Sequence, residues 1–297
     1  MRHETGMTVP TRSSTAGARK FAFTERDFER IRALIHARAG IALGSGKQEM
    51  AYSRLAHRLR CFGMASFDEY LNQLEAGQRD GEWEEFTNAL TTNLTSFFRE
   101  SHHFPILAEQ ARAAAQPLKI WCAGASTGEE AYSVAITLCE VFDTLTPPVR
   151  ILATDIDTKV LSIAAEGMYP LEKVSQIGEK RIRRFFLRGT GKNEGQVRIR
   201  PELRSLVTFG RSNLLAPRWP VKDKLDALFC RNVMIYFDKP TQAHIIGRFA
   251  LLMKPDGLLY AGHSENFLHA ADAFTLRGKT VYRLRGSGAE YVPARTA

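Results

Sequence analysis

The spacing of apolar positions divides the chain into a helical first third and a longer part in which strands and helices alternate. Between residues 21 and 92, apolar side chains such as Phe28, Ile31 and Ile35 recur at helical spacing, and no convincing strand is present. Farther along, short apolar runs alternate with helical patterns, which is typical of an α/β fold with a parallel sheet. We predict an all-helical N-terminal domain over residues 21–92 and an α/β domain over residues 93–285.

The second predicted helix, from about Gly46 to Arg60, carries a basic face. An advance of about 100° per residue places Lys47, Arg54 and Arg58 on one side of this helix, away from its apolar side. Acidic residues concentrate in the two helices that follow, so the basic charge is segregated. This face is either a docking surface for an acidic partner or an ordinary solvated face of a surface helix.

A strand, a glycine turn and a helix follow one another at Leu118–Glu130, with the sequence LKIWCAGASTGEE. The apolar run predicts a covered parallel strand, while Gly124 and Gly128 permit a tight backbone that a ligand can approach closely. The Gly-x-x-x-Gly spacing departs from the dinucleotide fingerprint G-x-G-x-x-G. Taken alone, the turn fits either a nucleotide-like ligand or a plain strand-to-helix connection.

Two later predicted strands end in polar residues that we expect to lie close to the glycine turn. The run PVRILATD ends at Asp155, and LDALFCRN ends at Arg231 and Asn232, shortly before Tyr236. Because the carboxyl ends of parallel strands line one crevice, these side chains should converge with Gly124. Asp155 would bind ribose hydroxyls there or cap the following helix, and Tyr236 would face the crevice or the core.

An interruption of the alternating pattern predicts a small inserted antiparallel β-subdomain over about residues 188–209. Three glycines precede the alternating pair Val197 and Ile199, and a further apolar run follows around Val207. The exposed edge of such a hairpin can recruit a peptide strand, although most hairpins do not. Near the end of the chain, KPDG predicts a turn between the closing strands.

Composition narrows the class of protein without identifying a partner. Of 297 residues, 44% are hydrophobic and 25% are charged, which is ordinary for a soluble globular protein. No apolar run approaches the roughly 20 residues of a membrane span, and the polar start lacks the apolar core of an export signal. We therefore expect a cytoplasmic protein with a disordered lead at residues 1–20 and a loose tail at 286–297. The net charge of +9 favours an acidic partner, which could be nucleic acid, a membrane surface or an acidic protein.

Neither a disulfide framework nor a metal site is predicted. The four cysteines are scattered without C-x-x-C pairs, and three of them lie in apolar segments. His102 and His103 are adjacent, but adjacent helical positions point in different directions, and no second pair of ligands lies at metal-binding spacing.

Four motifs, taken together, resemble the chemotaxis-receptor glutamate methyltransferases of the CheR type. They are TNLTSFFRESHHFPIL at residues 92–107, WCAGASTGEEAYSVAI at 121–136, ATDID at 153–157 and FCRNVMIYFDKPTQ at 229–242. The resemblance extends from about Phe21 to Arg285, in order and with family-like spacing. It implies S-adenosylmethionine (SAM) as methyl donor, S-adenosylhomocysteine as product, and a doubly wound Rossmann-like methyltransferase domain beside the helical domain and the inserted subdomain.

The resemblance also implies roles for particular residues. Donor contacts would fall on ten positions: Asn93, Thr95, Arg99, Gly124, Glu130, Asp155, Asn213, Leu214, Arg231 and Asn232. Arg99 and Tyr236 would lie beside the transferring methyl group as the catalytic pair. Receptor docking would involve two groups, Lys47, Arg54 and Arg58 on the basic helix, and Arg188, Gly189 and Gly191 in the hairpin. Ala131 stands where many members have proline, at a helix N-terminal position that tolerates either.

The implied acceptor is a glutamate in the cytoplasmic helical bundle of a chemoreceptor, and the hairpin could tether the receptor's C-terminal tail. A glutamate side chain is ionised near neutral pH, with a reference pKa of about 4.3, so it needs no general base. We therefore expect alignment and removal of water to supply most of the catalysis. Arg99 would orient an acidic group, and Tyr236 would donate a hydrogen bond or line the methyl path. No metal, nucleic acid or membrane insertion is expected.

Two other functions fit parts of the pattern. The chain could methylate a nucleic acid or a small molecule. However, residues 232–236 lack the double proline of the amino-methylating DNA enzymes, and the basic helix has few aromatic residues for stacking. The chain could instead be a non-catalytic module that binds SAM or receptors, although Arg99, Asp155 and Tyr236 are intact.

Overall fold

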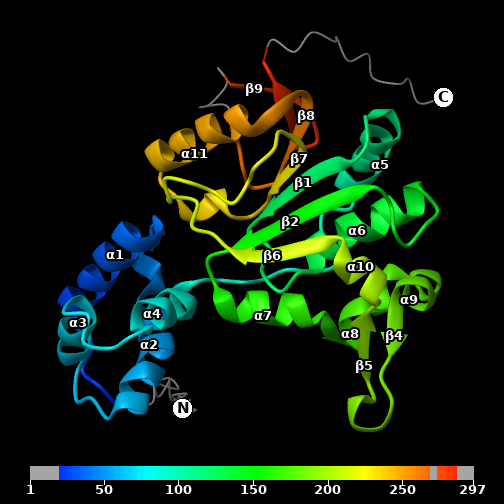
Figure 1. Cartoon of the computed structure of the whole chain (residues 1–297). Coiled ribbons are helices and arrows are strands. Elements are labelled where there is room, and N and C mark those ends of the chain that lie inside the picture. The colour runs from blue at the N-terminus through cyan, green and yellow to red at the C-terminus, as the bar shows by residue number, and fades with distance from the viewer. Residues whose placement is uncertain (1–19, 268–272, 286–297) are drawn as a thin grey trace, which may run out of the picture.

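The computed structural model describes residues 20–267 and 273–285. The lead expected at residues 1–20, save its last residue, and the tail expected at 286–297 lie outside the described residues. A helical domain lies beside an open sheet that carries helices on both faces (Figure 1). None of the helices within the described residues is long and apolar enough to span a bilayer.

The N-terminal domain is helical, as its pattern predicts. Its elements are α1 (Glu25–Ala39), the 3₁₀ turn η1 (Ser45–Lys47), α2 (Gln48–Phe62), α3 (Phe67–Glu75) and α4 (Glu82–Leu90). Thr24 and Asp27 form a capping box at the start of α1, and Gly40 ends that helix in the left-handed conformation. Lys47 precedes α2 because residues 45–47 form a separate 3₁₀ turn.

The larger domain contains a seven-stranded sheet. Its strands are β1 (Leu118–Ala123), β2 (Val149–Asp155), β6 (Val207–Arg211), β7 (Leu225–Cys230), β8 (Met253–Ala261), β9 (Phe274–Gly278) and β10 (Val281–Leu284). The order is β6-β2-β1-β7-β8-β10-β9. The first five strands run parallel, and β10 pairs antiparallel with both β8 and β9. The chain moves outward from β1 in one direction and later in the other. A crevice at this reversal is where open α/β sheets bind ligands.

Strand β1 is buried on both faces, which explains its continuous apolar sequence. Ile120 and Cys122 pack in the core beneath the sheet, while Trp121 and Ala123 pack in the core above it. The covering helices are α5 (His103–Ala113), α6 (Glu129–Val141) and α7 (Thr158–Glu166) on one side and α11 (Lys239–Leu252) on the other. The predicted doubly wound, Rossmann-like domain is confirmed.

The inserted subdomain has different bounds from those predicted. Its antiparallel sheet, in the order β3-β5-β4, contains β3 (Met168–Pro170), β4 (Phe186–Arg188) and β5 (Gln196–Ile199). Three short helices and two 3₁₀ turns complete the segment: α8 (Leu171–Val174), η2 (Ser175–Ile177), α9 (Glu179–Phe185), η3 (Gly191–Asn193) and α10 (Pro201–Ser205). The apolar run at Val207, assigned to this subdomain from sequence, instead pairs with β2 as the edge strand β6. The prediction failed because an alternating run fits either sheet, and pairing with β2 buries Val207 against the main core.

The KPDG segment is part of a strand, and the prediction of a turn there was wrong. Residues 253–261 form β8, and its pairing with β7 shifts register between Leu225 and Ala227. Leu225 pairs with Met253 and Ala227 pairs with Leu258, so the additional residues form a bulge. The Pro and Asp of KPDG are exposed on this bulge.

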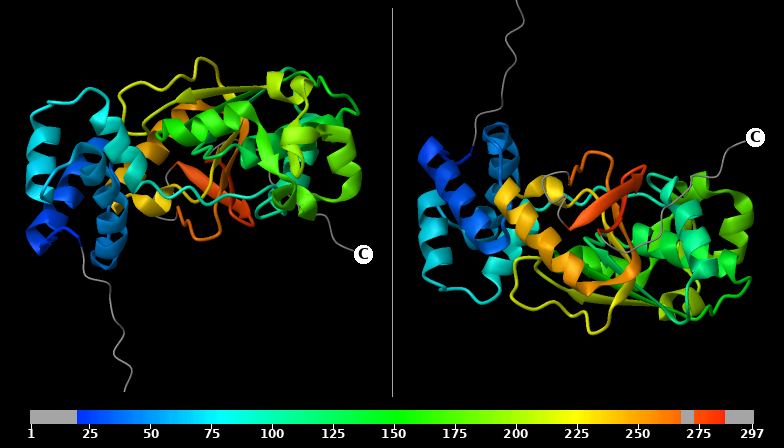
Figure 2. Two further views of the ribbon diagram at one scale, coloured as in Figure 1. Left: turned by 90° about the horizontal axis from the view of Figure 1, so that it is seen from below. Right: turned by 90° about the horizontal axis from the view of Figure 1, so that it is seen from above.

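The helical domain and the inserted subdomain lie at opposite ends of the molecule (Figure 2). At one end, α4 of the helical domain packs against α7. Glu84 on α4 accepts from the Thr158 hydroxyl and pairs with Arg211 at 2.9 Å. Glu85 pairs with Lys159 on α7. These polar contacts, together with the connecting segment at residues 91–102, fix the helical domain against the sheet.

Part of the basic face on α2 is occupied by contacts within the helical domain. Arg58 binds Glu82 through two nitrogens, with Nε 3.0 Å from Oε1, and also pairs with Glu85 at 3.2 Å. Glu82 is only 3% exposed and accepts a further hydrogen bond from Tyr70. Arg54 donates to the carbonyls of residues 89 and 91. Sequence alone could not reveal this, because Glu82 lies 24 residues beyond Arg58.

Replacing Arg58 with alanine should destabilise the helical domain, because it removes the counter-charge of a buried carboxylate. We expect a loss of about 3 kcal/mol or more in the free energy of unfolding, measured by urea titration. Arg60→Ala, an exposed position on the same helix, is the matched control and should change stability by at most about 0.5 kcal/mol. Equal stability of the two variants would contradict a structural role for Arg58.

Candidate functional site

A cavity of about 520 Å³ lies where the ends of β1, β2 and β7 meet the helical domain. This size is within the usual range for small-molecule sites. The connecting segment, the loop after β6, the 3₁₀ turn η4 (Met234–Tyr236) and residues 39–50 of the helical domain complete its wall. The ten positions proposed for donor binding all line this cavity, together with Lys47 and Tyr236. The other lining residues of the helical domain were not anticipated from sequence, and they include Ala39, Ile41, Ala42, Leu43, Gly44 and Met50.

Glycine is required at the turn after β1. Gly124 has φ +101°, a left-handed value, and a Cβ atom there would lie 2.2 Å from Cγ2 of Val233. Gly128, with φ +96°, would place a Cβ 2.9 Å from Ala164. The turn therefore passes close to the chain that follows β7, and it leaves its backbone bare at the floor of the cavity.

Asp155 joins the turns after β1 and β2. Its Oδ2 accepts the backbone N–H of Ser126 at 2.8 Å, and its Oδ1 accepts that of Asp157 at 3.0 Å. Burial raises the pKa of Asp155, while these hydrogen bonds oppose the shift. The alternative in which Asp155 caps α7 is wrong, because Asp157 is the N-cap residue and accepts from Lys159 and Val160.

The connecting segment is tied to these same turns. Asn93 donates from Nδ2 to Oδ2 of Asp157 at 2.7 Å, and its carbonyl accepts from the Ser126 hydroxyl at 3.0 Å. Arg99 donates from Nη1 to the carbonyl of Leu94 at 3.0 Å. Thr95 lines the cavity between them. Asp157 and Ser126 were missed in the sequence analysis, although ATDID contains a second acid two residues after the first.

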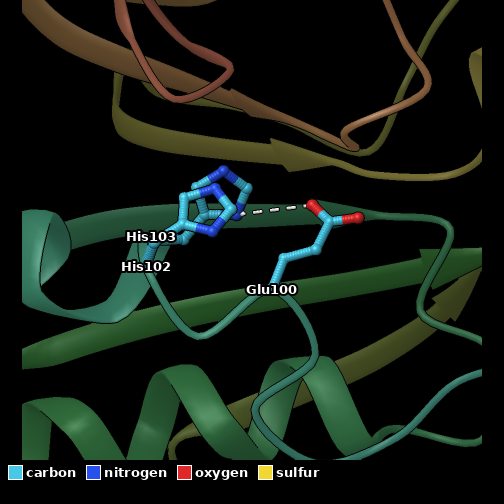
Figure 3. Close-up of side chains that lie close together, drawn as sticks. All are labelled: Glu100, His102 and His103. Carbon is cyan, nitrogen blue, oxygen red and sulfur yellow. Dashed lines mark ion pairs between the residues drawn. The ribbon is translucent and has the colours of Figure 1, made fainter.

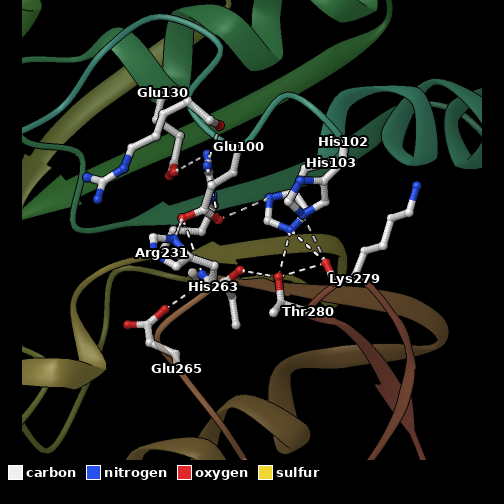
Figure 4. A network of polar contacts seen from close by, with 12 residues as sticks. Glu100, His102, His103, Glu130, Arg231, His263, Glu265, Lys279 and Thr280 are labelled. Carbon is white, nitrogen blue, oxygen red and sulfur yellow. Dashed lines mark hydrogen bonds and ion pairs between the residues drawn. The ribbon is translucent and has the colours of Figure 1, made fainter.

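Arg231 and Glu130 form an ion pair at the floor of the cavity (Figure 4). The Arg231 side chain is 2% exposed, and its Nη1 lies 3.0 Å from Oε2 of Glu130. Its Nη2 donates to the carbonyl of Arg99. Burial raises the pKa of Glu130, and the adjacent guanidinium opposes this shift. The pair therefore links the start of α6 to the end of β7 and to the connecting segment.

A buried glutamate that the sequence analysis missed organises the turn after β7. Asn232 adopts φ +60°, a left-handed conformation that asparagine tolerates better than most residues. Glu265, 5% exposed, then accepts the backbone N–H groups of Val233 and Met234 at 2.8 Å each and that of Gly262. These bonds position η4 and its Tyr236. No motif marked Glu265, because Val233 and Met234 lie 32 and 31 residues before it and contribute only backbone groups.

Tyr236 and Asn213 connect the cavity wall to the helical domain. Tyr236 donates from its hydroxyl to the carbonyl of Thr92 at 3.3 Å, and its own carbonyl accepts from Ala42 at 2.7 Å. Asn213 donates from Nδ2 to the carbonyl of Arg38 at 2.9 Å. Leu214 is buried beside it. Tyr236 is therefore neither a fully buried core aromatic nor fully exposed.

The residues proposed for receptor docking lie in three places. Lys47 lines the cavity itself. Arg54 and Arg58 line a separate groove with His57 and Lys159. The hairpin residues lie in the inserted subdomain, and they are Arg188, which pairs with Glu179 at 2.8 Å, Gly189, whose N–H donates to Gln196, and Gly191, with φ +58°.

His102 and His103 point in the same direction, contrary to the sequence-based expectation. Their ring centroids are 4.2 Å apart, and the Nε2 atoms of both lie near the carbonyl of Lys279. His102 is the N-cap residue of α5 and has a helical backbone, with φ −63°, so the shared direction comes from the side chains, which both turn to the Lys279 carbonyl. With Glu100 they form a group whose potential ligand atoms lie within 4.8 Å of one another (Figure 3). Nη2 of Arg231, however, lies 3.4 Å from the Glu100 carboxylate, and this cation would repel a metal ion there.

An open sheet that reverses beside β1, with a glycine turn and a buried acid at adjacent strand ends, defines the class of doubly wound enzymes that bind nucleotide-like cofactors. Comparison with protein families gives the particular group. Residues 93–283 match the family described as "CheR methyltransferase, SAM binding domain", and residues 26–91 match "CheR methyltransferase, all-alpha domain". The chain belongs to the CheR family of SAM-dependent methyltransferases.

Curated relatives agree with this assignment. The chain is 51% identical over 265 residues to the chemotaxis protein methyltransferase of Escherichia coli K12, covering 89% of this chain and 93% of that protein. It is 50% identical over 279 residues to chemotaxis protein methyltransferase 2 of Pseudomonas aeruginosa, covering 93% of this chain and 99% of that protein. The resemblance noted from the four sequence motifs is therefore confirmed.

The burial of His103 predicts a pH dependence of stability. Burial, with Arg231 nearby, lowers the pKa of His103 from 6.5 to about 3, so the unfolded chain binds a proton that the folded chain does not. The stability that neutral, buried His103 gives to the folded state is therefore complete above pH 6.5. It is lost as the pH falls towards 3. Urea unfolding between pH 7.5 and 4.5 should show this decline, with at most about 1.4 kcal/mol per pH unit from one proton.

His103→Gln should reduce that slope, while His244→Gln, at an exposed position, should leave it unchanged. The comparison of slopes separates His103 from the carboxylates that titrate in the same range. A slope in His103→Gln equal to that of the unsubstituted protein would contradict the assignment.

Proposed function

We propose that this protein transfers a methyl group from SAM to glutamate side chains of chemotaxis receptors, forming glutamate methyl esters. The titratable side chains of the cavity support this choice of acceptor. Among the residues described, no histidine or cysteine lines the cavity. Glu130 is paired with Arg231, and Asp155 accepts two backbone N–H groups, so neither carboxylate is a free base. An amine or hydroxyl acceptor would need such a base, whereas a carboxylate arrives ionised.

The cavity residues fit the methyl donor. Gly124 lines the cavity and has no side chain, so a ligand there meets the backbone of the turn. A carboxylate has about four acceptor positions, so Asp155 keeps capacity for ribose hydroxyls beside its two backbone contacts. When bound, SAM supplies a methyl group on a sulfonium, which becomes a neutral thioether as the S–C bond breaks and an ester O–C bond forms. The proposed donor contacts are Asn93, Thr95, Arg99, Gly124, Glu130, Asp155, Asn213, Leu214, Arg231 and Asn232.

Arg99 and Tyr236 are the proposed catalytic residues. A guanidinium has five N–H donors, so Arg99 keeps donors for an incoming carboxylate after binding the carbonyl of Leu94. Burial raises the pKa of Tyr236, which keeps the phenol neutral. Its single O–H donates to the Thr92 carbonyl and would turn to the acceptor carboxylate when that binds. Neither residue has to move a proton, since the acceptor is already an anion. Their contribution is to orient the carboxylate and replace the water around it.

Receptor docking is proposed to occur beside the cavity and on the inserted subdomain. Lys47 at the cavity wall would attract the acidic segment that surrounds a target glutamate in the receptor's cytoplasmic helical bundle. Arg54 and Arg58 would contribute from the groove that they share with Lys159. The hairpin at residues 188–191 lies at the other end of the molecule (Figure 2), so it could hold a receptor tail while the helical domain engages the bundle.

The product should be a base-labile ester on glutamate. The protein, incubated with methyl-labelled SAM and a receptor cytoplasmic fragment, should yield label that base releases as methanol and that mass spectrometry maps to glutamate. Tyr236→Phe should lower the transfer rate about tenfold through the lost hydrogen bond, and Arg99→Ala should lower it further. Arg112→Ala, at an exposed position on α5, should have no effect. Base-stable label, or near-normal transfer by the double variant Arg99→Ala/Tyr236→Phe, would reject these roles.

Transfer should weaken with salt if opposite charges guide docking. Charge reversal in Lys47→Glu should raise the KM for the receptor fragment by about tenfold at low ionic strength, and the difference should shrink as salt is added. Lys222→Glu, at an exposed position before β7, makes the same charge change outside both proposed docking regions and is the control. Arg58 is unsuitable for this test because its replacement should also disturb folding. Salt-independent KM values in the unsubstituted protein would count against electrostatic docking.

A further inference from the structure

Glu100 is a buried acid that none of the roles above uses. It lies on the connecting segment just after Arg99, and its side chain is 8% exposed. Phe98 and Glu100 both adopt left-handed backbone conformations, with φ +54° and +53°. Such conformations are uncommon outside glycine and persist when the surroundings hold them. The segment is therefore held in a defined path at this point.

The Glu100 carboxylate contacts the strand ends through both oxygens (Figure 4). Its Oε1 accepts the backbone N–H of His263 at 3.2 Å and lies 2.8 Å from Nδ1 of the same residue. Its Oε2 lies 3.4 Å from Nη2 of Arg231. The pKa of Glu100 is lowered to about 2 despite burial, through the contacts with His263 and Arg231. The group is thus ionised throughout the physiological range.

Arg231 is consequently held between two carboxylates. Glu130 binds Nη1, and Glu100 lies beside Nη2, the nitrogen that donates to the carbonyl of Arg99. Without Glu100, the buried Arg231 guanidinium would have one carboxylate partner. The ion pair that joins Glu100 to Arg231, the residue after β7, would also be lost. An ion pair between two groups shielded from water is screened little, so it restrains both partners.

We propose that Glu100 is a positioning residue that holds the Arg231 guanidinium against the Arg99 carbonyl and so fixes the connecting segment over the donor cavity. It acts through residues 93–99, which carry three of the proposed donor contacts, and the inference rests on those contacts. Glu100 itself does not line the cavity. Binding of a metal ion would be a different role for the same carboxylate, because His102 and His103 lie beside it.

The test compares Glu100→Gln with Glu109→Gln in the full chain. Glutamine keeps the size of Glu100 and removes its charge, while Glu109 is 65% exposed on α5. Calorimetry should show that Glu100→Gln weakens SAM binding about tenfold, because the ion pair with Arg231 is lost and the Arg99 carbonyl is held less firmly. In steady-state assays its KM for SAM should rise, and its KM for the receptor fragment should not. Glu109→Gln should match the unsubstituted protein in both measurements.

The two KM values separate positioning from a general folding defect. A folding defect reduces the amount of active protein, so it lowers the apparent kcat and leaves both KM values unchanged. If Glu100→Gln does not fold, Glu100→Asp keeps the charge on a shorter side chain. It should show a smaller rise in the SAM dissociation constant, because the carboxylate no longer reaches both partners.

Three results would overturn the inference. One is a folded Glu100→Gln protein whose SAM dissociation constant and KM are unchanged. Another is an unchanged SAM dissociation constant in Glu100→Asp. The third is a loss of SAM affinity in the unsubstituted protein after treatment with a chelator, which would assign Glu100 to a metal centre. Failure of the proposed function is distinguishable, because in that case the unsubstituted protein itself would form no methyl ester.

Discussion

Backbone N–H groups at the ends of three strands need acceptors, and buried carboxylates provide them. Asp155 accepts from the turns after β1 and β2, and Glu265 accepts from the turn after β7. Burying these acids raises the pKa of each, but leaving the N–H groups without partners would cost free energy as well. Because each carboxylate joins two segments, the acids that shape the cavity are already committed. The proposed acceptor, a carboxylate, brings its own negative charge and needs no base from these acids.

The helical domain and the inserted subdomain both contact segments that form the cavity, in addition to lying beside the sheet. Ala42 of the helical domain donates to the Tyr236 carbonyl. In the opposite direction, Asn213 donates to the carbonyl of Arg38 in the helical domain. From the other end, Tyr169 of the inserted subdomain donates to the carbonyl of Thr127 in the glycine turn at 2.7 Å. A displacement of either accessory part would thus reach the donor cavity through backbone contacts, and the helical domain cannot move away without opening the cavity wall.

Local sequence patterns predicted the parts of the site that depend on local geometry. The glycine turn, the acid after β2 and the polar end of β7 follow from apolar runs and from the rule that parallel strands end on one side. Contacts between distant segments were not predictable in this way. Glu82 neutralises Arg58 from another helix, and Glu265 binds backbone groups that any sequence would carry. The strand at Val207 has the same alternation in either sheet, so only its pairing with β2 decides where it belongs.

The charges around the cavity are arranged by element. The acids Glu130 and Asp155 come from the sheet side, at the start of α6 and the end of β2, whereas Lys47 and Arg99 come from the helical domain and the connecting segment. Arg231 neutralises the charge of Glu130, whereas Asp155 accepts a hydrogen bond from the backbone N–H of Ser126. Such a separation suits the proposed reaction, in which a cationic donor would be attracted to the sheet side and an anionic acceptor to the other. Alignment of the pair then follows from the positions of the fixed charges, without any group that has to gain or lose a proton.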